Sequence, residues 1–181
     1  MSAWTVISHV EAPSSQATIV FSSIPASFTD LCIKMSARST SEINSTIKWA
    51  EIILQPNGSG SNLSARSLLG YWSGSAQTVT SNTDAITGGF ANGNTTTSNT
   101  FSNVEIYIPN YAGSTNKSWS IDSVTEHNGN EALRWISANL WSQTTAISSI
   151  TLDMTQGDFA QYSSATLYGI LKGSSGGVTV S

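Results

Sequence analysis

The sequence is poor in cysteine, in charge and in long apolar runs, and each shortage excludes a class of protein. A single cysteine, Cys32, stands among 181 residues, so an intrachain disulfide cannot form. Only 10 % of the residues are charged, with 7 Lys and Arg against 11 Asp and Glu, and no basic run alternates with aromatic residues. We therefore expect neither nucleic-acid binding through phosphate neutralisation nor, without a run of membrane-spanning length, a membrane partner.

The amino end, MSAWTVISHV, lacks the positively charged start and long apolar stretch of a secretory signal peptide. We expect a soluble protein made without such a leader. Cys32 stands in an alternating run, LCIKMSAR, which favours a buried apolar role for its side chain over a reactive thiol.

Ser and Thr are abundant instead, and together they make up about 30 % of the chain, well above ordinary usage. These residues are weak helix formers that favour turns and the solvent-facing positions of strands. The composition therefore predicts an all-β protein.

Apolar residues recur with a period of two, which is typical of strands with one buried face. The clearest run is Leu31, Ile33, Met35 and Ala37, and further runs lie around Ile19, Trp49, Ile106 and Trp119 and in two closing segments, 147–154 and 165–171. Turn-forming clusters such as QPNGSGSN, PNYAGSTN and QGD separate them. We predict one domain over residues 1–172, a jelly-roll-like β-sandwich of about ten short strands with Gly/Ser/Asn-rich loops.

Two stretches are ambiguous. Residues 130–143, NEALRWISANLWSQ, place Leu133, Ile136 and Leu140 at near-helical spacing but also alternate through Leu133, Trp135 and Ser137, and we favour a strand. Residues 73–103 are low in complexity, and we expect loops around short edge strands there, with the glycines of ITGGFANGN in turns. This middle region is a candidate for meeting a partner.

No constellation of catalytic or metal-binding residues emerges. His9 lies in a strand-like run and His127 in a turn, without metal-ligand spacing, so both are expected to be solvated or at an edge. Glu126 could be paired with Glu105 or with Asp122 as the two carboxylates of a glycosidase, but alternation places about half of all acidic residues on a common face, so the pairing is weakly supported. We assign no catalytic, metal or cofactor-binding residue.

Aromatic residues offer the only candidate ligand contacts. There are six tryptophans, and in LLGYWSGS Tyr71 and Trp72 precede a Gly/Ser-rich stretch, which makes them the candidate surface aromatics for stacking on a sugar ring. Packing in the core is the commoner use of tryptophan and is favoured even for Trp72.

Three segments carry a resemblance: FSSIPASFTDLCIKMSARST, SNVEIYIPNYAGSTNKSWSIDSVTEHN, and LWSQTTAISSITLDMTQGDFAQYSSATLYGI. In this order they resemble small virion structural proteins of tailed bacteriophages, including marine phages and cyanophages. The resemblance implies a non-enzymatic β-sandwich that assembles on the particle, with the major capsid protein or other virion subunits as partners. It carries over no catalytic motif and no binding residue.

Two roles fit that resemblance. The first is a capsid decoration or cement protein on the exterior of the head, and the alternative is a tail-fibre or receptor-binding module that takes up carbohydrate. We expect a virion location and, because particles supply three-fold positions, a homotrimer.

Relatives of this kind end near LYGI, here Leu167–Ile170, whereas this chain continues with LKGSSGGVTVS. A Gly/Ser-rich tail retains too much chain entropy for weak local contacts to hold it. We expect residues 173–181 to dock on a neighbouring chain, with Val178, Thr179, Val180 and Ser181 added to the edge of its sheet. Packing of the tail against its own domain is the open alternative.

Overall fold

A computed structural model describes residues 4–42, 48–71, 76–81, 87–129 and 132–171, and these residues contain strands and no helix. The tail residues Val178–Ser181 and Trp72 lie outside this range. The strands are β1 (Trp4–Glu11), β2 (Thr18–Phe21), β3 (Asp30–Ala37), β4 (Trp49–Pro56), β5 (Leu63–Tyr71), β6 (Ala76–Ser81), β7 (Gly89–Asn92), β8 (Ser102–Pro109), β9 (Lys117–Thr125), β10 (Leu133–Trp141), β11 (Ile150–Met154) and β12 (Ser164–Ile170).

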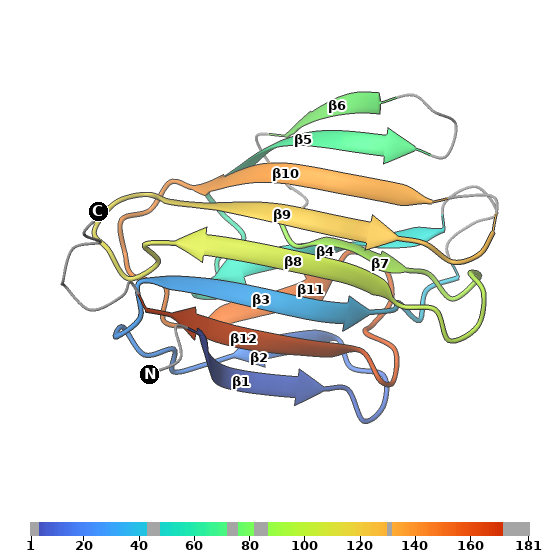
Figure 1. The fold of residues 1–181 in the computed structure, drawn as a ribbon, viewed down its shortest axis with the longest axis horizontal. Helices are drawn as coiled ribbons and strands as arrows, with labels where there is room; N and C mark the ends of the chain where they lie inside the picture. The colour runs from blue at the N-terminus through green and yellow to red at the C-terminus, as the bar shows by residue number, and fades with distance from the viewer. Residues whose placement is uncertain (1–3, 43–47, 72–75, 82–86, 130–131, 172–181) are drawn as a thin grey trace, which may run out of the picture.

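The strands form two antiparallel sheets that pack face to face (Figure 1). The larger sheet has eight strands in the order β1-β12-β3-β8-β9-β10-β5-β6, and the smaller has four in the order β2-β11-β4-β7. From β1 to β4 the chain alternates between the sheets, and it does so again from β7 to β8 and from β11 to β12. Eight strands wrapped between two four-stranded layers are the jelly-roll arrangement, so the predicted fold is confirmed.

Four strands are additions to this framework. The strands β9, β10, β5 and β6 continue the larger sheet beyond β8, past the width of the four-stranded sheet, as Figure 1 shows. We call β1, β12, β3 and β8 the jelly-roll half of the large sheet, and β9, β10, β5 and β6 the extension.

Alternation of buried residues with exposed or half-buried ones explains why most of these segments are strands. Buried and exposed positions alternate along the whole of β10, and β8, β9 and β12 follow the same period. The core lies between the sheets, where Ile33 and Ile106 from the large sheet are as fully buried as Leu54 from the small one. Burying such side chains contributes about 1.5–3 kcal/mol each.

Both ambiguous stretches contain strands. Residues 130–143 contain strand β10, as favoured, and the middle region contains β6 and β7, each at the edge of a sheet. The interpretation of ITGGFANGN as turns is wrong, because Gly89–Asn92 forms β7. Gly89 has a φ of 97°, and a Cβ there would lie 3.0 Å from Val104 Cγ1, so glycine lets β7 approach the large sheet.

A buried arginine fastens the loop that follows β7. The Arg38 guanidinium donates hydrogen bonds to the carbonyl oxygens of Asn94, Thr96, Thr97 and Thr100, and to the hydroxyls of Thr96 and Thr100. No carboxylate is among these acceptors, and burial lowers the pKa of Arg38. Among the described residues, the guanidinium therefore holds the loop through neutral oxygens.

Candidate binding face

The face of the large sheet that points away from the small sheet is the candidate functional surface, and we call it the outer face. The register between neighbouring strands aligns residues from all eight strands into a row across it. In strand order this outer row is His9, Thr166, Lys34, Glu105, Asp122, Ile136, Leu68 and Thr78.

Charged groups in the middle of the outer row are already paired with one another. Lys34 Nζ lies 2.6 Å from Glu105 Oε2, and Arg134 Nη2 lies 2.6 Å from Asp122 Oδ2. The bond to Glu105 raises the pKa of Lys34. All four side chains are about half exposed, so each pair contributes only about 0–1 kcal/mol to stability. Together with Asn103 and Val124 these carboxylates and Arg134 line a shallow polar depression.

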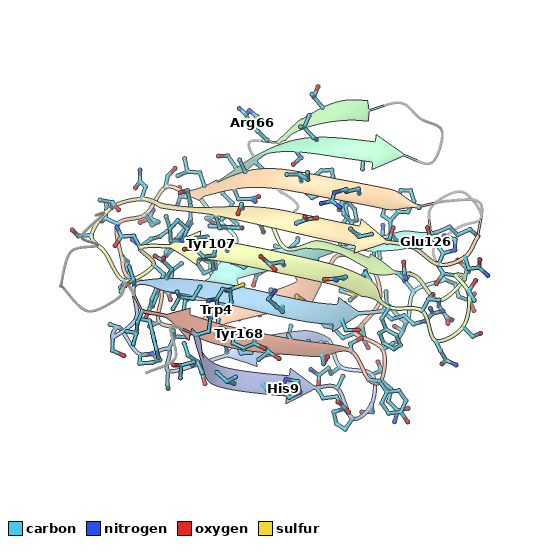
Figure 2. All side chains as sticks on the ribbon, in the orientation of Figure 1. Trp4, His9, Arg66, Tyr107, Glu126 and Tyr168 are labelled. Carbon is cyan, nitrogen blue, oxygen red and sulfur yellow. The ribbon has the colours of Figure 1, made fainter. Side chains whose placement is uncertain are left out.

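An aromatic cluster lies at the β1 end of the outer face. The rings of Trp4 and Tyr168 meet edge to face with their centroids 5.7 Å apart, and Lys34 Nζ lies 5.9 Å from the centre of the Trp4 ring. Figure 2 shows Trp4, Tyr168 and Tyr107 along the same side of the sheet. The Tyr107 hydroxyl donates to Asp30 Oδ2 at 2.6 Å, and this bond raises the pKa of Tyr107 to about 12. Trp4 is 43 % exposed, and an exposed indole is a group that can stack on the apolar face of a sugar ring.

The opposite end of the outer face is apolar. Leu68 is 55 % exposed, Ile136 47 % and Leu140 37 %, and these three residues, on β5 and β10, define what we call the apolar patch. A shallow hollow beside it is lined by Arg66, Thr78, Ser120 and Ala138, with Leu68 and Ile136.

At the apolar patch, the usual distribution of polar and apolar residues between the two faces of the sheet is reversed. Beneath the outer row, the matching inner row runs Leu167, Ile33, Ile106, Ile121, Ser137 and Ser67. From β12 to β9 the inner residue is apolar and the outer one polar, as expected of a sheet with one solvated face. At β10 and β5 the order reverses, with buried serines inside and exposed Ile136 and Leu68 outside.

The carboxylates proposed as glycosidase pairs do not come together in either predicted combination. Glu105 and Asp122 are directly opposite on β8 and β9, whereas Glu126 follows β9 and lies about 13 Å further along the strand direction. The Glu126 carboxylate instead accepts a hydrogen bond from the Asn128 amide at 2.7 Å. A retaining or inverting pair needs a separation of about 5–9.5 Å.

The two histidines and the cysteine have structural surroundings. His9 is exposed, with Nδ1 2.8 Å from the Thr166 hydroxyl, but His127 is buried, so the expectation that it is solvated or at an edge is wrong. The ring fits because residue 129 is glycine, whose added Cβ would lie 2.4 Å from His127 Cε1. Cys32 is fully buried as predicted, and burial, with a smaller effect of Glu105, raises its pKa to about 11.

Of the predicted contact residues, Tyr71 ends strand β5, while Trp72 and Val178–Ser181 fall outside the described residues. The aromatic cluster was missed because Trp4 and Tyr168 are distant in sequence and only the β1–β12 pairing brings them together. Four other tryptophans, Trp49, Trp119, Trp135 and Trp141, are buried, which fits the favoured packing role.

Within the described ranges no group of three His, Cys, Asp or Glu residues could hold a metal ion. In the same ranges no helix is long and apolar enough to cross a membrane. In comparisons with known proteins, no family model matches the chain, and neither a curated protein nor a solved structure matches it.

Proposed function

We propose that the chain is a non-enzymatic structural protein of a bacteriophage virion, which binds as a decoration protein to the outer surface of the assembled head. The resemblance of three sequence segments to phage structural proteins suggests this role, and the jelly roll is an architecture that viral capsid proteins use. The major capsid protein or another virion subunit would be the partner.

The observation that carries the proposal is the inversion of polarity in the extension. Ile136 and Leu68 are exposed to water although the serines beside them in sequence are buried. The hydration of these apolar side chains is unfavourable, and a protein partner that covers the apolar patch removes this free-energy cost. Removing apolar surface from water contributes about 25 cal/mol per Å². On the outer face, Lys34 is paired with Glu105 and Arg134 with Asp122, so these four groups need no opposite charge from the partner.

The mechanism is mass action. A protein that binds only the assembled shell stabilises that state by RT ln(1 + [L]/Kd), and an interface of standard size buries about 1,600 Å² in total. Many bound copies of the protein would thus raise the temperature at which the head opens.

The test uses heads prepared without this protein. Wild-type chain should bind at many copies per head and raise the temperature of genome release, whereas Ile136→Asp should reduce affinity at least tenfold, because it places a charge in the apolar patch. Val20→Asp, on the exposed side of β2 in the small sheet, is the matched control and should bind like wild type. Absence of binding to heads, or unchanged binding of Ile136→Asp, contradicts the proposal.

A second role, carbohydrate binding at a tail fibre or receptor-binding tip, is favoured by the aromatic cluster of Trp4, Tyr168 and Lys34. Cryo-electron microscopy of intact particles separates the two roles, because decoration predicts many copies on the shell and receptor binding predicts a few at the tail. Under the second role, Trp4→Ala abolishes binding to a glycan array, and Trp72→Ala tests the tryptophan that the sequence indicated. If neither changes an observed glycan signal, the aromatic residues are not the site.

A further inference from the structure

The two sheets end in four edge strands, and three of them are protected against pairing with another chain. Strand β2 has only four residues. Strand β7 is closed by Ser123, whose hydroxyl accepts from the Phe90 amide at 3.0 Å, and by Ser39, whose amide donates to the Asn92 carbonyl. Strand β1 carries a register shift between Val6 and Ser8, and short strands and bulges are recognised protections of an edge.

The fourth edge, β6, has none of these protections. Its six residues, AQTVTS, pair with β5 through six consecutive positions without a bulge, and they include neither a charged residue nor proline. β6 is also the last strand in the order of its sheet, so its outer backbone groups have no strand neighbour among the described residues. Such an edge is a template for an additional strand.

We propose that residues 178–181 of a second copy of this chain add as a strand to the free edge of β6. The segment VTVS contains three consecutive β-branched residues, in which Val and Thr alternate, and it carries no charged side chain; the same is true of TVTS within β6. The Gly/Ser-rich residues 173–177 would serve as the linker between the two chains. This proposal concerns self-association and does not depend on the virion role.

The lengths of chain exclude the same pairing within one molecule. In the sheet order, the position beyond β6 is seven strand spacings from β12, which is about 34 Å at about 4.8 Å per spacing. From Ile170 to Val178 the fully extended chain reaches at most about 29 Å. Figure 1 shows β12 and β6 toward opposite ends of the large sheet. The tail can thus reach β6 only on another copy.

The tail could reach the edge of its own β1, which is about 10 Å from β12, but that edge is the less suitable acceptor. The register shift at Val6 and Ser8 interrupts the β1 ladder, whereas β6 offers six uninterrupted positions. The added strand also continues the row Ile136, Leu68 and Thr78, so a valine placed on the outer face would extend the apolar patch. The uninterrupted ladder of β6 and the neighbouring apolar patch therefore both favour β6 as the acceptor strand.

Cross-linking in trans tests the pairing directly. Two forms of the full chain, Thr78→Cys and Val180→Cys, both of which place the thiol on the outer face, are given tags of different mass, mixed, and treated with a short bis-maleimide, which tolerates small differences in register. Buried Cys32 should stay unreactive. We expect a cross-linked product of both chains in the mixture, and at least tenfold less when Ser36→Cys, on a central strand, replaces Thr78→Cys.

Three outcomes overturn the proposal. A strong product from Thr78→Cys alone would mean that β6 pairs with β6, and a monomeric product from the double variant Thr5→Cys/Thr179→Cys would mean that the tail lies on its own β1. The third is a wild-type chain that sediments as a monomer at all concentrations and gives no product in the mixture.

Sedimentation of variants tests the energetics. Thr78→Lys places a charge on the exposed edge and should weaken self-association at least tenfold, and deletion of residues 173–181 should abolish it. Ser36→Lys, the matched control on β3, should associate like wild type. An oligomer that survives the deletion contradicts the proposal even if the protein binds phage heads, and a failure to bind heads leaves these results unaffected.

Discussion

The two halves of the large sheet are built from the same alternating strands, yet their inner faces differ. In the jelly-roll half the inner face is apolar, with Ile33 and Ile106 lying against the small sheet. In the extension, Ser137 and Asn139 are buried beside the tryptophans of β10, and the Ser137 hydroxyl donates to Asn139 Oδ1 at 3.1 Å. Both halves contribute buried residues to the core, and the comparison indicates that the extension in addition presents exposed apolar residues on its outer side.

The largest expected effect is a difference in stability between substitutions on the inner face and on the outer face of the large sheet. Ile106→Ala in the jelly-roll half should lower the free energy of unfolding by about 2–5 kcal/mol, because it removes buried methyl groups and leaves a cavity. Ile136→Ala, the same change in the apolar patch, should lie within about 1 kcal/mol. Urea unfolding measures both, and equal losses would contradict the assignment of faces.

Two buried cations extend the comparison. Arg38→Met should destabilise by roughly 3 kcal/mol, because it leaves the oxygens of the 94–100 loop without their donor. Lys117, at the start of β9, donates to the Thr115 and Thr144 carbonyls and has no carboxylate partner among the described residues, so Lys117→Met should be neutral or stabilising. Thermal unfolding of the two variants measures these effects. A larger loss of stability for Lys117→Met than for Arg38→Met would contradict this account.

Tyr107→Phe tests a contact on the outer side of the jelly-roll half. Loss of the hydrogen bond to Asp30 should cost about 1 kcal/mol. In ultraviolet titration of the native protein, one tyrosine ionising near pH 12 should disappear from the variant, because Asp30 holds the pKa of Tyr107 at about 12. A titration unchanged by the substitution would show that another tyrosine ionises there.

The smallest effect is on pH dependence. Burial lowers the pKa of Lys117 below 10.5, so the unfolded chain binds more protons between the lowered value and 10.5. The contribution of Lys117 to stability therefore rises with pH through that window. The difference in unfolding free energy between wild type and Lys117→Met should change in favour of wild type as the pH is raised toward 10.5, and a constant difference would argue against a buried charge.

The candidate surface could be predicted only in part. Alternation predicts that Lys34, Glu105 and Ile136 each lie on the solvent side of their own strand. It does not predict which strands are neighbours in the sheet. The apolar patch was hidden because Ile136 lies in the segment where helical and strand spacing compete. The pairing of Trp4 with Tyr168 had no local signal at all.

The sequence by itself determined the all-β class, the sandwich and the burial of Cys32, because a period of two and frequent turn residues act over a few neighbouring positions. Only the tertiary structure decided which strands are neighbours, and so which edge is open and where polarity inverts. The physical reason is distance along the chain. His9 and Thr166 share a hydrogen bond across 157 positions, and such pairings follow from the packing of the whole molecule.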